Sequence, residues 1–408
     1  MNMQGKNTPM PKDDIRSRLG LRPVINVSGT MTSLGASIVV PQAVEAVSAI
    51  LTEFVELGDL HRQASNTIAD LTGADAGFIT ASCSAAISLA VAAAMTGPDL
   101  AAIERLPDTT GLKDEVVILS GHMVGYGAPV EQAIRLTGAK VGPVGQATHA
   151  HAYQLRGAIG DKTAAAVYVV SHHVVDYGQI PLKVFAAVAH ERGVPVIVDA
   201  ASEYDLTGFL ADGADLVLYS GHKFLGGPTS GIVAGSKERV RDVYLQNRGI
   251  GRGMKVGKEG IVGALAALQA WKTRDHDGIR AREKKALDCW VEALEKRPGI
   301  KAEIVPDPTN NPLDRLKVSV DPAEARITAW DIADRLAAGD PPVIVRDHEV
   351  EHGHFYLDPC NLHPDEEFTV AVRLEEELDR ARKSNTIVAT PFEERLLAHE
   401  AAILKWPD

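Results

Sequence analysis

The sequence predicts an α/β protein whose central sheet is largely parallel. Between about residues 75 and 235, short apolar runs alternate with segments that carry a helical pattern of apolar residues. Several runs, such as 116–119 and 196–198, are apolar at successive positions. Continuous apolar runs are typical of strands that helices cover on both faces, and strands alternating with helices pair in parallel. We therefore expect a sheet buried between two layers of helices.

Each expected element has its own stretch of sequence. The expected strands cover residues 76–80, 115–120, 164–170, 194–199 and 215–220. The first four are followed by helical patterns at 84–95, at 129–138, at 182–193 and in a short stretch after 199. A longer helical region over 257–298 ends at Pro298-Gly299, and strand-like runs follow at 301–307, 315–320 and 341–347.

This change of pattern predicts the domain organisation. We expect an N-terminal arm over residues 1–40, a large α/β domain over 41–275 and a small α+β domain over 276–408. The arm is expected to pack over the functional site. No internal repeat or low-complexity tract stands out.

Composition narrows the classes of function. The formal net charge is -12, from 42 basic and 54 acidic residues, so a broad basic surface for nucleic acid is not expected. The only cysteines, Cys83, Cys289 and Cys360, are too few for a disulfide framework and favour a reducing compartment. The sequence has no apolar leader and no run long enough to cross a membrane. We expect a cytoplasmic protein with no membrane or nucleic-acid partner.

Chemically useful side chains follow the expected strands, at the edge where open α/β sheets bind ligands. Each could also have an ordinary role as a helix cap, a turn residue or a surface charge. In chain order they are Ser82, Cys83, Ser84, Ala85 and Ala86, then Gly121 and His122, then His172 and His173, then Asp199, and finally His222 and Lys223.

Together these residues predict a pyridoxal 5′-phosphate site. A helix N-terminus with free amides and hydroxyls is suited to a phosphate group. A lysine can hold an aldehyde as a Schiff base, and a carboxylate can keep a ring nitrogen protonated.

The segment Asp215–Pro228 resembles the Ser-x-x-Lys signature of fold-type I pyridoxal-phosphate enzymes, with Ser220 and Lys223 in the matching positions. Asp199 precedes Lys223 by 24 positions (223 minus 199), at the end of the preceding expected strand, where that family has the partner of its pyridine nitrogen. This resemblance implies a mostly parallel seven-stranded sheet and a smaller C-terminal α+β domain.

Within that superfamily, the chain is similar to the branch of selenocysteine synthase and D-glucosaminate-6-phosphate ammonia-lyase. The similarity is carried by RPVINVSGTMTSLG, ITASCSAAISLAVAAAMTG, SGHKFLGGPTSGIVAG, the Lys258-Glu259-Gly260 helix start and PPVIVR, roughly over residues 20–375. Selenocysteine synthase has an additional N-terminal tRNA-binding domain. Fewer than 25 residues precede RPVIN here, so we expect a small-molecule substrate rather than tRNA.

The resemblance implies roles for individual residues. Lys223 would form the Schiff base and later move the Cα proton, Asp199 would keep the pyridine ring protonated, and His122 would stack on the ring. Arg346 would bind the substrate carboxylate, and His172 would act as an acid or as a structural imidazole. Phosphate contacts are expected from Ser82, Ser84, Ala85, Ala86, Ser220 and His222.

The function implied is α,β-elimination on a hydroxy amino acid or amino-sugar acid, which gives a 2-oxo acid and ammonia. Racemisation or epimerisation is the first alternative and needs a second acid, for which Cys83, His172 or His61 would serve. Aldol cleavage of a β-hydroxy amino acid is the next alternative. The family also implies a homodimer or higher oligomer.

Two further motifs are open to a different interpretation. Arg248, Arg252 and Lys255 form a basic loop that would bind a substrate phosphate, reach a partner's cofactor or simply be solvated. His348–His352 matches the zinc-protease pattern H-E-x-x-H, which functions only on a helix. We expect a strand, a turn and a strand here, which would separate the two histidines by roughly 13 Å at about 3.3 Å per residue, so no metal is predicted.

Overall fold

The computed structural model describes residues 14–175 and 177–407, which divide into two compact units. One unit comprises Gly35–Asp275 and Asp307–Pro312, and the other comprises the remaining described residues. The predicted arm therefore divides: residues 1–13 lie outside the described residues, 14–34 belong to the second unit and 35–40 to the first. The predicted domain boundaries stay a prediction.

The first unit is built on a seven-stranded sheet, so the predicted α/β class is confirmed. Its strand order is β2-β8-β7-β6-β5-β3-β4, and only β8 runs antiparallel to its neighbours. The bounds are β2 Ala76–Thr80, β3 Glu115–Leu119, β4 Lys140–Val144, β5 Thr163–Val169, β6 Val196–Asp199, β7 Leu216–Ser220 and β8 Gly231–Gly235.

All five strands expected in this region are present, but β4 and β8 were not predicted as strands. β4 contains Gly142 and Pro143, which weaken a strand pattern and are tolerated here because β4 is an edge strand. β8 is the run GIVAG, whose two glycines have low strand propensity and weaken the strand pattern of the sequence. Only the tertiary arrangement identifies both runs as strands.

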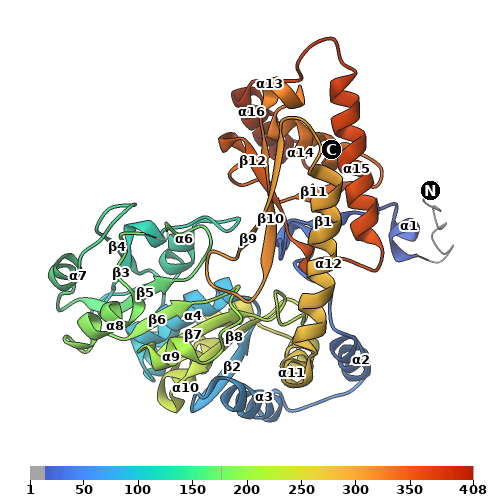
Figure 1. The fold of residues 1–408 in the computed structure, drawn as a ribbon. Helices are drawn as coiled ribbons and strands as arrows, with labels where there is room; N and C mark the ends of the chain where they lie inside the picture. The colour runs from blue at the N-terminus through green and yellow to red at the C-terminus, as the bar shows by residue number, and fades with distance from the viewer. Residues whose placement is uncertain (1–13, 176, 408) are drawn as a thin grey trace. The chain divides into compact units, whose positions relative to one another are not determined.

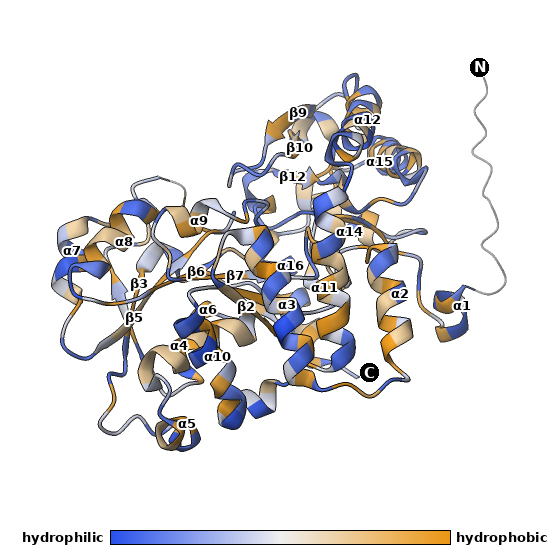
Figure 2. Cartoon of the chain, turned by 90° about the horizontal axis from the view of Figure 1, so that it is seen from below, coloured by the Kyte–Doolittle hydropathy of each residue, from blue (hydrophilic) through white to orange (hydrophobic). Residues whose placement is uncertain are grey.

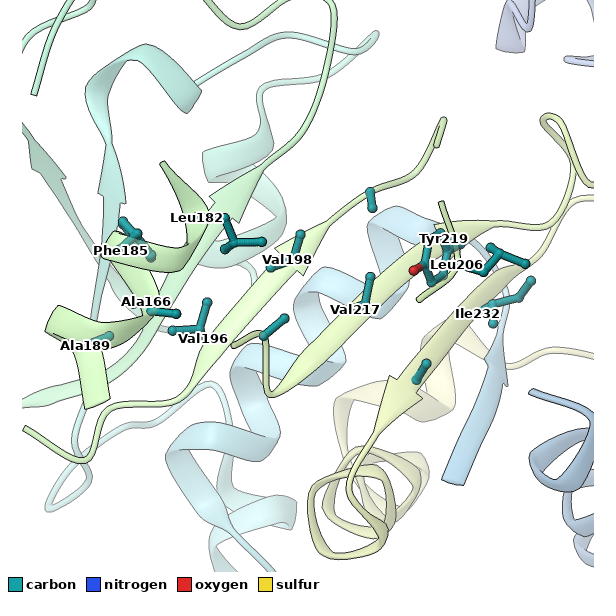
Figure 3. Packing of buried hydrophobic residues seen from close by; sticks show 14 of the residues in the cluster. Ala166, Leu182, Phe185, Ala189, Val196, Val198, Leu206, Val217, Tyr219 and Ile232 are labelled. Atoms are coloured by element: carbon teal, nitrogen blue, oxygen red, sulfur yellow. The ribbon is translucent and has the colours of Figure 1, made fainter. Parts of the chain in front are cut away.

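Helices cover both faces of this sheet (Figure 1). Along β3, Val117 and Leu119 pack into one cluster of buried residues while Val116 and Ile118 pack into the other. The first cluster, which Figure 3 shows from close by, includes α3 (Leu57–Thr72), α8 (Leu182–His190) and α11 (Lys258–Thr273). The second includes α4 (Cys83–Thr96), α6 (Val130–Arg135) and α10 (Lys237–Leu245). The continuous apolar strand runs are explained because both faces are buried.

Helix α4 is apolar around its whole circumference and is buried along nearly its whole length. Figure 2 draws it in pale to orange colours, which mark neutral to hydrophobic residues. It begins after Ser82, whose hydroxyl accepts a hydrogen bond from the Ala85 amide at 3.0 Å. This cap fixes where the helix begins.

The second unit contains an antiparallel sheet in the order β12-β10-β9 and a parallel pair of β1 with β11. The bounds are β1 Ile25–Val27, β9 Ile300–Pro306, β10 Asp314–Val320, β11 Val343–Val345 and β12 His354–Leu357. Its core includes Trp290, on α12 (His276–Leu294), together with residues of α14 (Ala329–Ala338) and α15 (Glu366–Arg382). β11 ends at Val345, His348 and Glu349 form a turn, and Val350–His352 is a 3-10 turn before β12, so the segment is not the α-helix that a zinc-protease motif requires.

The remaining elements are short or peripheral. They are α1 Ile15–Leu19, α2 Pro41–Ile50, α5 Leu100–Arg105, α7 Ala152–Ala158, α9 Gly208–Ala211, α13 Pro322–Ala325 and α16 Phe392–Leu404, with 3-10 turns at Thr32–Leu34, Ser120–His122, Gln246–Arg248, Ile250–Met254, Val350–His352 and Pro359–Asn361. None of the helices among the described residues has the length and apolar character needed to cross a membrane.

We predict that Phe185→Ala lowers the free energy of unfolding by about 3 to 5 kcal/mol, because it leaves a cavity where a fully buried ring packs against the sheet. Val184→Ala is the matched control, since Val184 is the neighbouring residue and is exposed. Urea unfolding of both variants provides the measurement. Equal loss of stability in the two variants would contradict the packing of α8 described here.

Candidate active site

The carboxyl ends of adjacent strands bring the predicted site residues together. In the register of the sheet, Val169 of β5 pairs with Asp199 of β6, and Asp199 pairs with Leu218 of β7. His122 follows β3, which is the next strand beyond β5. The strand order therefore places His122, Asp199 and the turn that contains Lys223 along one edge of the sheet.

Lys223 lies in the connection between β7 and β8, and its ammonium group donates a 2.6 Å hydrogen bond to the Ser202 hydroxyl. The start of this connection is tightly closed: the Gly221 amide donates to the Ser230 carbonyl at 2.9 Å. A Cβ atom on Gly221 would lie only 2.1 Å from Ser230 Oγ, so glycine is required there. Arg274 donates to the carbonyls of Phe224 and Leu225, each at 2.6 Å, and fixes the turn beyond the lysine.

Asp199 is a buried carboxyl group with few donors. Its Oδ1 accepts hydrogen bonds from the Cys83 thiol at 3.4 Å and from the Ala201 amide at 3.1 Å. Among the described residues, no hydrogen bond reaches Oδ2. Burial raises the pKa of Asp199 above its usual value, and the positive charge of Lys223 opposes this rise only in part. The carboxylate would therefore be stabilised by a further positively charged donor.

His122 is a neutral imidazole in the core of the site. Its Nδ1 accepts a hydrogen bond from the Val169 amide at 3.1 Å, so the ring proton is on Nε2. Burial lowers the pKa of His122 to about 4. The edge-to-face contact with Tyr168, at 4.4 Å between ring centroids, fixes the orientation of the ring.

The N-terminus of α4 differs in detail from what the sequence suggested. The amides of Ala85 and Ala86 already donate to the side chain and the carbonyl of Ser82, both at 3.0 Å. The amides of Cys83 and Ser84 have no acceptor among the described residues. The Ser84 hydroxyl lies 3.0 Å from the Tyr126 hydroxyl. The backbone amides of Cys83 and Ser84, rather than those of the two alanines, are therefore available to bind an anion.

The other predicted residues have diverse surroundings. Ser220 is buried at the end of β7, and His222 is buried with an Nδ1 atom that has no partner among the described residues. Ser37, from the predicted arm, donates to the His222 carbonyl at 2.7 Å. His172 is half-buried, and its ring centroid lies 3.9 Å from that of His173.

Two residues named in the sequence analysis lie away from this edge or in the other unit. His61 packs against Phe78 of β2, a strand that β8 separates from β7, and burial lowers the pKa of His61 to about 4. Arg346 belongs to the second unit. Burial raises the pKa of Asp358 there, but the charge of Arg315, hydrogen bonds from Cys360 and the charge of Arg346 together hold it below its usual value. The substrate-binding role of Arg346 stays a prediction.

Sequence reasoning missed three polar side chains of this site. Ser202 holds Lys223, Tyr126 contacts Ser84, and Glu203 is a buried acid beside Ser202. Ser202 and Glu203 follow Asp199 closely in the chain, which is a signal that could have identified them. Tyr126 lies in an irregular loop, and no sequence pattern marks it.

The geometry fits pyridoxal phosphate. Lys223 supplies an amine, Oδ2 of Asp199 is available to a protonated ring nitrogen, and the Cys83 and Ser84 amides together with the Ser84 hydroxyl are available to a phosphate group. The unpartnered Nδ1 of the buried His222 is a further polar atom that a ligand could satisfy. Burial around the carboxylate also excludes competing water.

Comparison with known proteins agrees with this arrangement. The family described as "SelA: L-seryl-tRNA selenium transferase" matches residues 24–297. A D-glucosaminate-6-phosphate ammonia lyase from Salmonella typhimurium is 39% identical over 90% of this chain and 99% of its own length. A 5'-C-glycyluridine monooxygenase-decarboxylase from a Streptomyces species is 35% identical over 88% of this chain and 90% of its own length.

Solved structures share the fold. The structure of D-glucosaminate-6-phosphate ammonia-lyase has a TM-score of 0.82 at 38% identity and covers 91% of this chain and 100% of its own chain. An aspartate aminotransferase from Thermus thermophilus, at 18% identity, has a TM-score of 0.52 over 90% of this chain and 93% of its own. The fold is fold-type I, as the resemblance implied.

Proposed function

Because this chain belongs to the SelA family, we propose that it is a pyridoxal-phosphate-dependent lyase, which eliminates ammonia from a hydroxylated amino-sugar acid. The observation that carries the proposal is the buried Asp199 beside Lys223, at the sheet edge where such a cofactor would bind. Similarity to the ammonia lyase over nearly the full length of both chains supports this reaction over the alternatives.

Bound pyridoxal phosphate would supply an aldehyde that captures an amine and a ring that accepts an electron pair. Lys223 is the amine that holds the cofactor, and Asp199 keeps the ring nitrogen protonated through Oδ2. His122, neutral and fixed by Val169 and Tyr168, presents a flat face to the ring. The Cys83 and Ser84 amides bind the phosphate.

With the substrate amine held by the cofactor, the free amine of Lys223 would take the proton from the substrate Cα. The same group would return this proton to the β-hydroxyl, which would leave as water. Lys223 would then displace the substrate nitrogen from the cofactor, and the released enamine would be hydrolysed, which consumes one water and gives a 2-oxo acid and ammonia. Ser202, which holds Lys223 Nζ at 2.6 Å, orients the amine for this transfer.

Racemisation remains the main alternative because it begins with the same removal of the Cα proton. It needs a second acid on the opposite face, and the Cys83 thiol is poorly suited, because burial and the charge of Asp199 raise its pKa well above the usual value. His61 packs against β2 as a neutral ring. The surroundings of Cys83 and His61 therefore favour elimination, while the half-buried His172 stays a candidate for the second acid.

We predict that Lys223→Ala abolishes turnover while leaving the fold intact, because the variant lacks the amine that would hold the cofactor and accept the Cα proton. The measurement is visible absorption of the purified protein with pyridoxal phosphate, before and after borohydride reduction, with the label mapped to a peptide. Lys237→Ala is the control, since Lys237 is an exposed lysine of the same unit. Substantial activity in Lys223→Ala would refute the assignment.

The basic loop provides a test of the substrate. Arg248, Arg252 and Lys255 are exposed and have no ion pair or hydrogen-bond partner among the described residues, so they are available to a phosphorylated substrate. We predict that replacing Arg248 and Arg252 by alanine raises KM for D-glucosaminate 6-phosphate by about 10-fold to 100-fold, as expected for the loss of charged hydrogen bonds.

The control for the basic loop is Arg192→Ala, an exposed arginine elsewhere in the same unit. The assay measures ammonia and 2-oxo acid from D-glucosaminate 6-phosphate and from D-glucosaminate. Carbon dioxide release without ammonia would argue against the lyase, and exchange of the Cα proton with the amine retained would favour a racemase. If replacing Arg248 and Arg252 by alanine raised KM equally for D-glucosaminate 6-phosphate and for D-glucosaminate, these arginines would not bind the substrate phosphate.

We also propose a cytoplasmic homodimer or higher oligomer. The three cysteines are free thiols, which suits a reducing compartment. Exposed apolar side chains on and after α2, including Val44, Leu51 and Phe54, offer a surface for subunit contact. We predict a mass of at least twice 43.5 kDa in sedimentation at equilibrium, and that Phe54→Asp weakens association. A wild-type monomer at micromolar concentration would disprove this assembly.

A further inference from the structure

A buried acid that the proposed reaction does not use lies directly beside the lysine site. Glu203 is 7% exposed and follows Ser202, the residue whose hydroxyl holds Lys223. Its carboxyl group faces residues 307–311, which belong to the same unit. Asp307 of this segment is 4% exposed, so two acids are buried close together.

Thr309 links the two acids by hydrogen bonds, and their lengths indicate that Glu203 holds a proton. Thr309 Oγ1 lies 2.7 Å from Asp307 Oδ1 and 3.2 Å from Glu203 Oε1, and it accepts a 3.0 Å hydrogen bond from Asn311 Nδ2. A hydroxyl group has one proton to donate, and the shorter distance directs it to Asp307. The bond to Glu203 is then complete only if Glu203 donates its own proton to Thr309.

Asp307 accepts several hydrogen bonds on one oxygen atom. Its Oδ1 also accepts hydrogen bonds from the Thr309 amide at 2.9 Å and from Asn311 Nδ2 at 3.2 Å. Several donors on one oxygen stabilise a carboxylate. The carboxyl group of Glu203 has hydrogen bonds with Thr309 and Asn311, but it is buried beside Asp307, so a negative charge on Glu203 would be disfavoured. The hydrogen-bond geometry thus favours a neutral Glu203.

The same network fixes the backbone around Ser202. The two protons of Asn311 Nδ2 are shared among the Ser202 carbonyl at 3.2 Å, Thr309 Oγ1 and Asp307 Oδ1, and Asn311 Oδ1 accepts from the Tyr204 amide at 2.8 Å. Both residues that flank Glu203 are therefore held by one side chain of the network. Displacement of Asn311 or Thr309 would move Ser202 and, with it, the hydrogen bond to Lys223 Nζ.

We propose that Glu203 is a positioning residue for Lys223: as a neutral acid it closes the network that places Ser202, and its ionisation disrupts this network and displaces the Ser202 hydroxyl from Lys223 Nζ. This inference rests on the proposed function, in which Lys223 holds the cofactor and moves the Cα proton. Loss of the Ser202 contact would leave the amine of Lys223 without the group that orients it for this transfer.

The electrostatic surroundings agree with the hydrogen-bond assignment. Burial raises the pKa of Glu203 to about 8 and Asp307 adds to the rise, while the hydrogen bonds with Thr309 and Asn311 and the charge of Lys223 oppose it. The Tyr219 phenol on β7 and Asp205 complete the titratable groups nearby, and burial raises the pKa of Tyr219 so that it stays neutral. Glu203 therefore changes from its neutral to its ionised form at neutral to mildly alkaline pH.

The test compares wild type with Glu203→Gln, because glutamine has the shape of the protonated acid and donates a hydrogen bond but cannot ionise. We expect similar kcat at neutral pH. One pH unit above the pKa of Glu203, kcat of the variant should exceed that of wild type by about tenfold, since each pH unit changes the ratio of ionised to neutral acid tenfold. Glu104→Gln, at an exposed glutamate, is the control and should follow wild type.

A second readout does not depend on the reaction. The folded chain holds a proton on Glu203 that the unfolded chain loses above about 4.5, so the contribution to stability is present below that pH and is lost as the pH rises through about 8. Glu203→Gln should become progressively more stable than wild type over this range in urea unfolding. A stability difference that does not change with pH would overturn the neutral state of Glu203.

The outcomes separate the two proposals. A pH-dependent stability difference with identical kcat profiles would leave Glu203 neutral but would overturn its positioning role. Failure of wild type to take up pyridoxal phosphate would contradict the proposed function, while the stability readout would still decide the proton assignment. Both expected shifts together would support the inference.

Discussion

The buried carboxyl group of Asp199 is the constraint on which the rest of the site depends. A charge at the end of a strand in an apolar sheet is costly unless a positive group or several donors compensate it. Among the described residues, Asp199 is compensated by a thiol, one amide and the nearby charge of Lys223. The site therefore favours a ligand with a positively charged ring nitrogen.

Sheet topology turns this constraint into a usable geometry. Parallel β3, β5, β6 and β7 end at one edge, which aligns His122 and Asp199 with the turn after β7. β8 then returns antiparallel beside β7, so the connection that contains Lys223 begins and ends at the same place. The contact of Gly221 with Ser230 closes this connection and directs the lysine back to the sheet edge.

Neutral groups surround the charged pair. Burial lowers the pKa of His122 and raises that of Glu203, so both side chains are in their neutral forms at neutral pH. Neutral side chains can stack, donate and accept without competing with Asp199 and Lys223 for the charges of a ligand. In the proposed reaction, a hydrogen-bond network that includes residues 307–311, remote in sequence from Lys223, would position these groups.

The sequence by itself determined the α/β class, the five strands with apolar runs and the residues that follow them, because a buried strand and the ligand-binding edge both have local sequence patterns. It could not reveal β4 and β8, since Pro143 and the glycines of GIVAG mask their strand character. Only the tertiary structure shows that the amides of Ala85 and Ala86 donate to Ser82. It also shows that Thr309 and Asn311 lie beside the segment that contains Glu203. Hydrogen bonds between residues far apart in the chain have no periodicity to detect, and their partners are decided by packing.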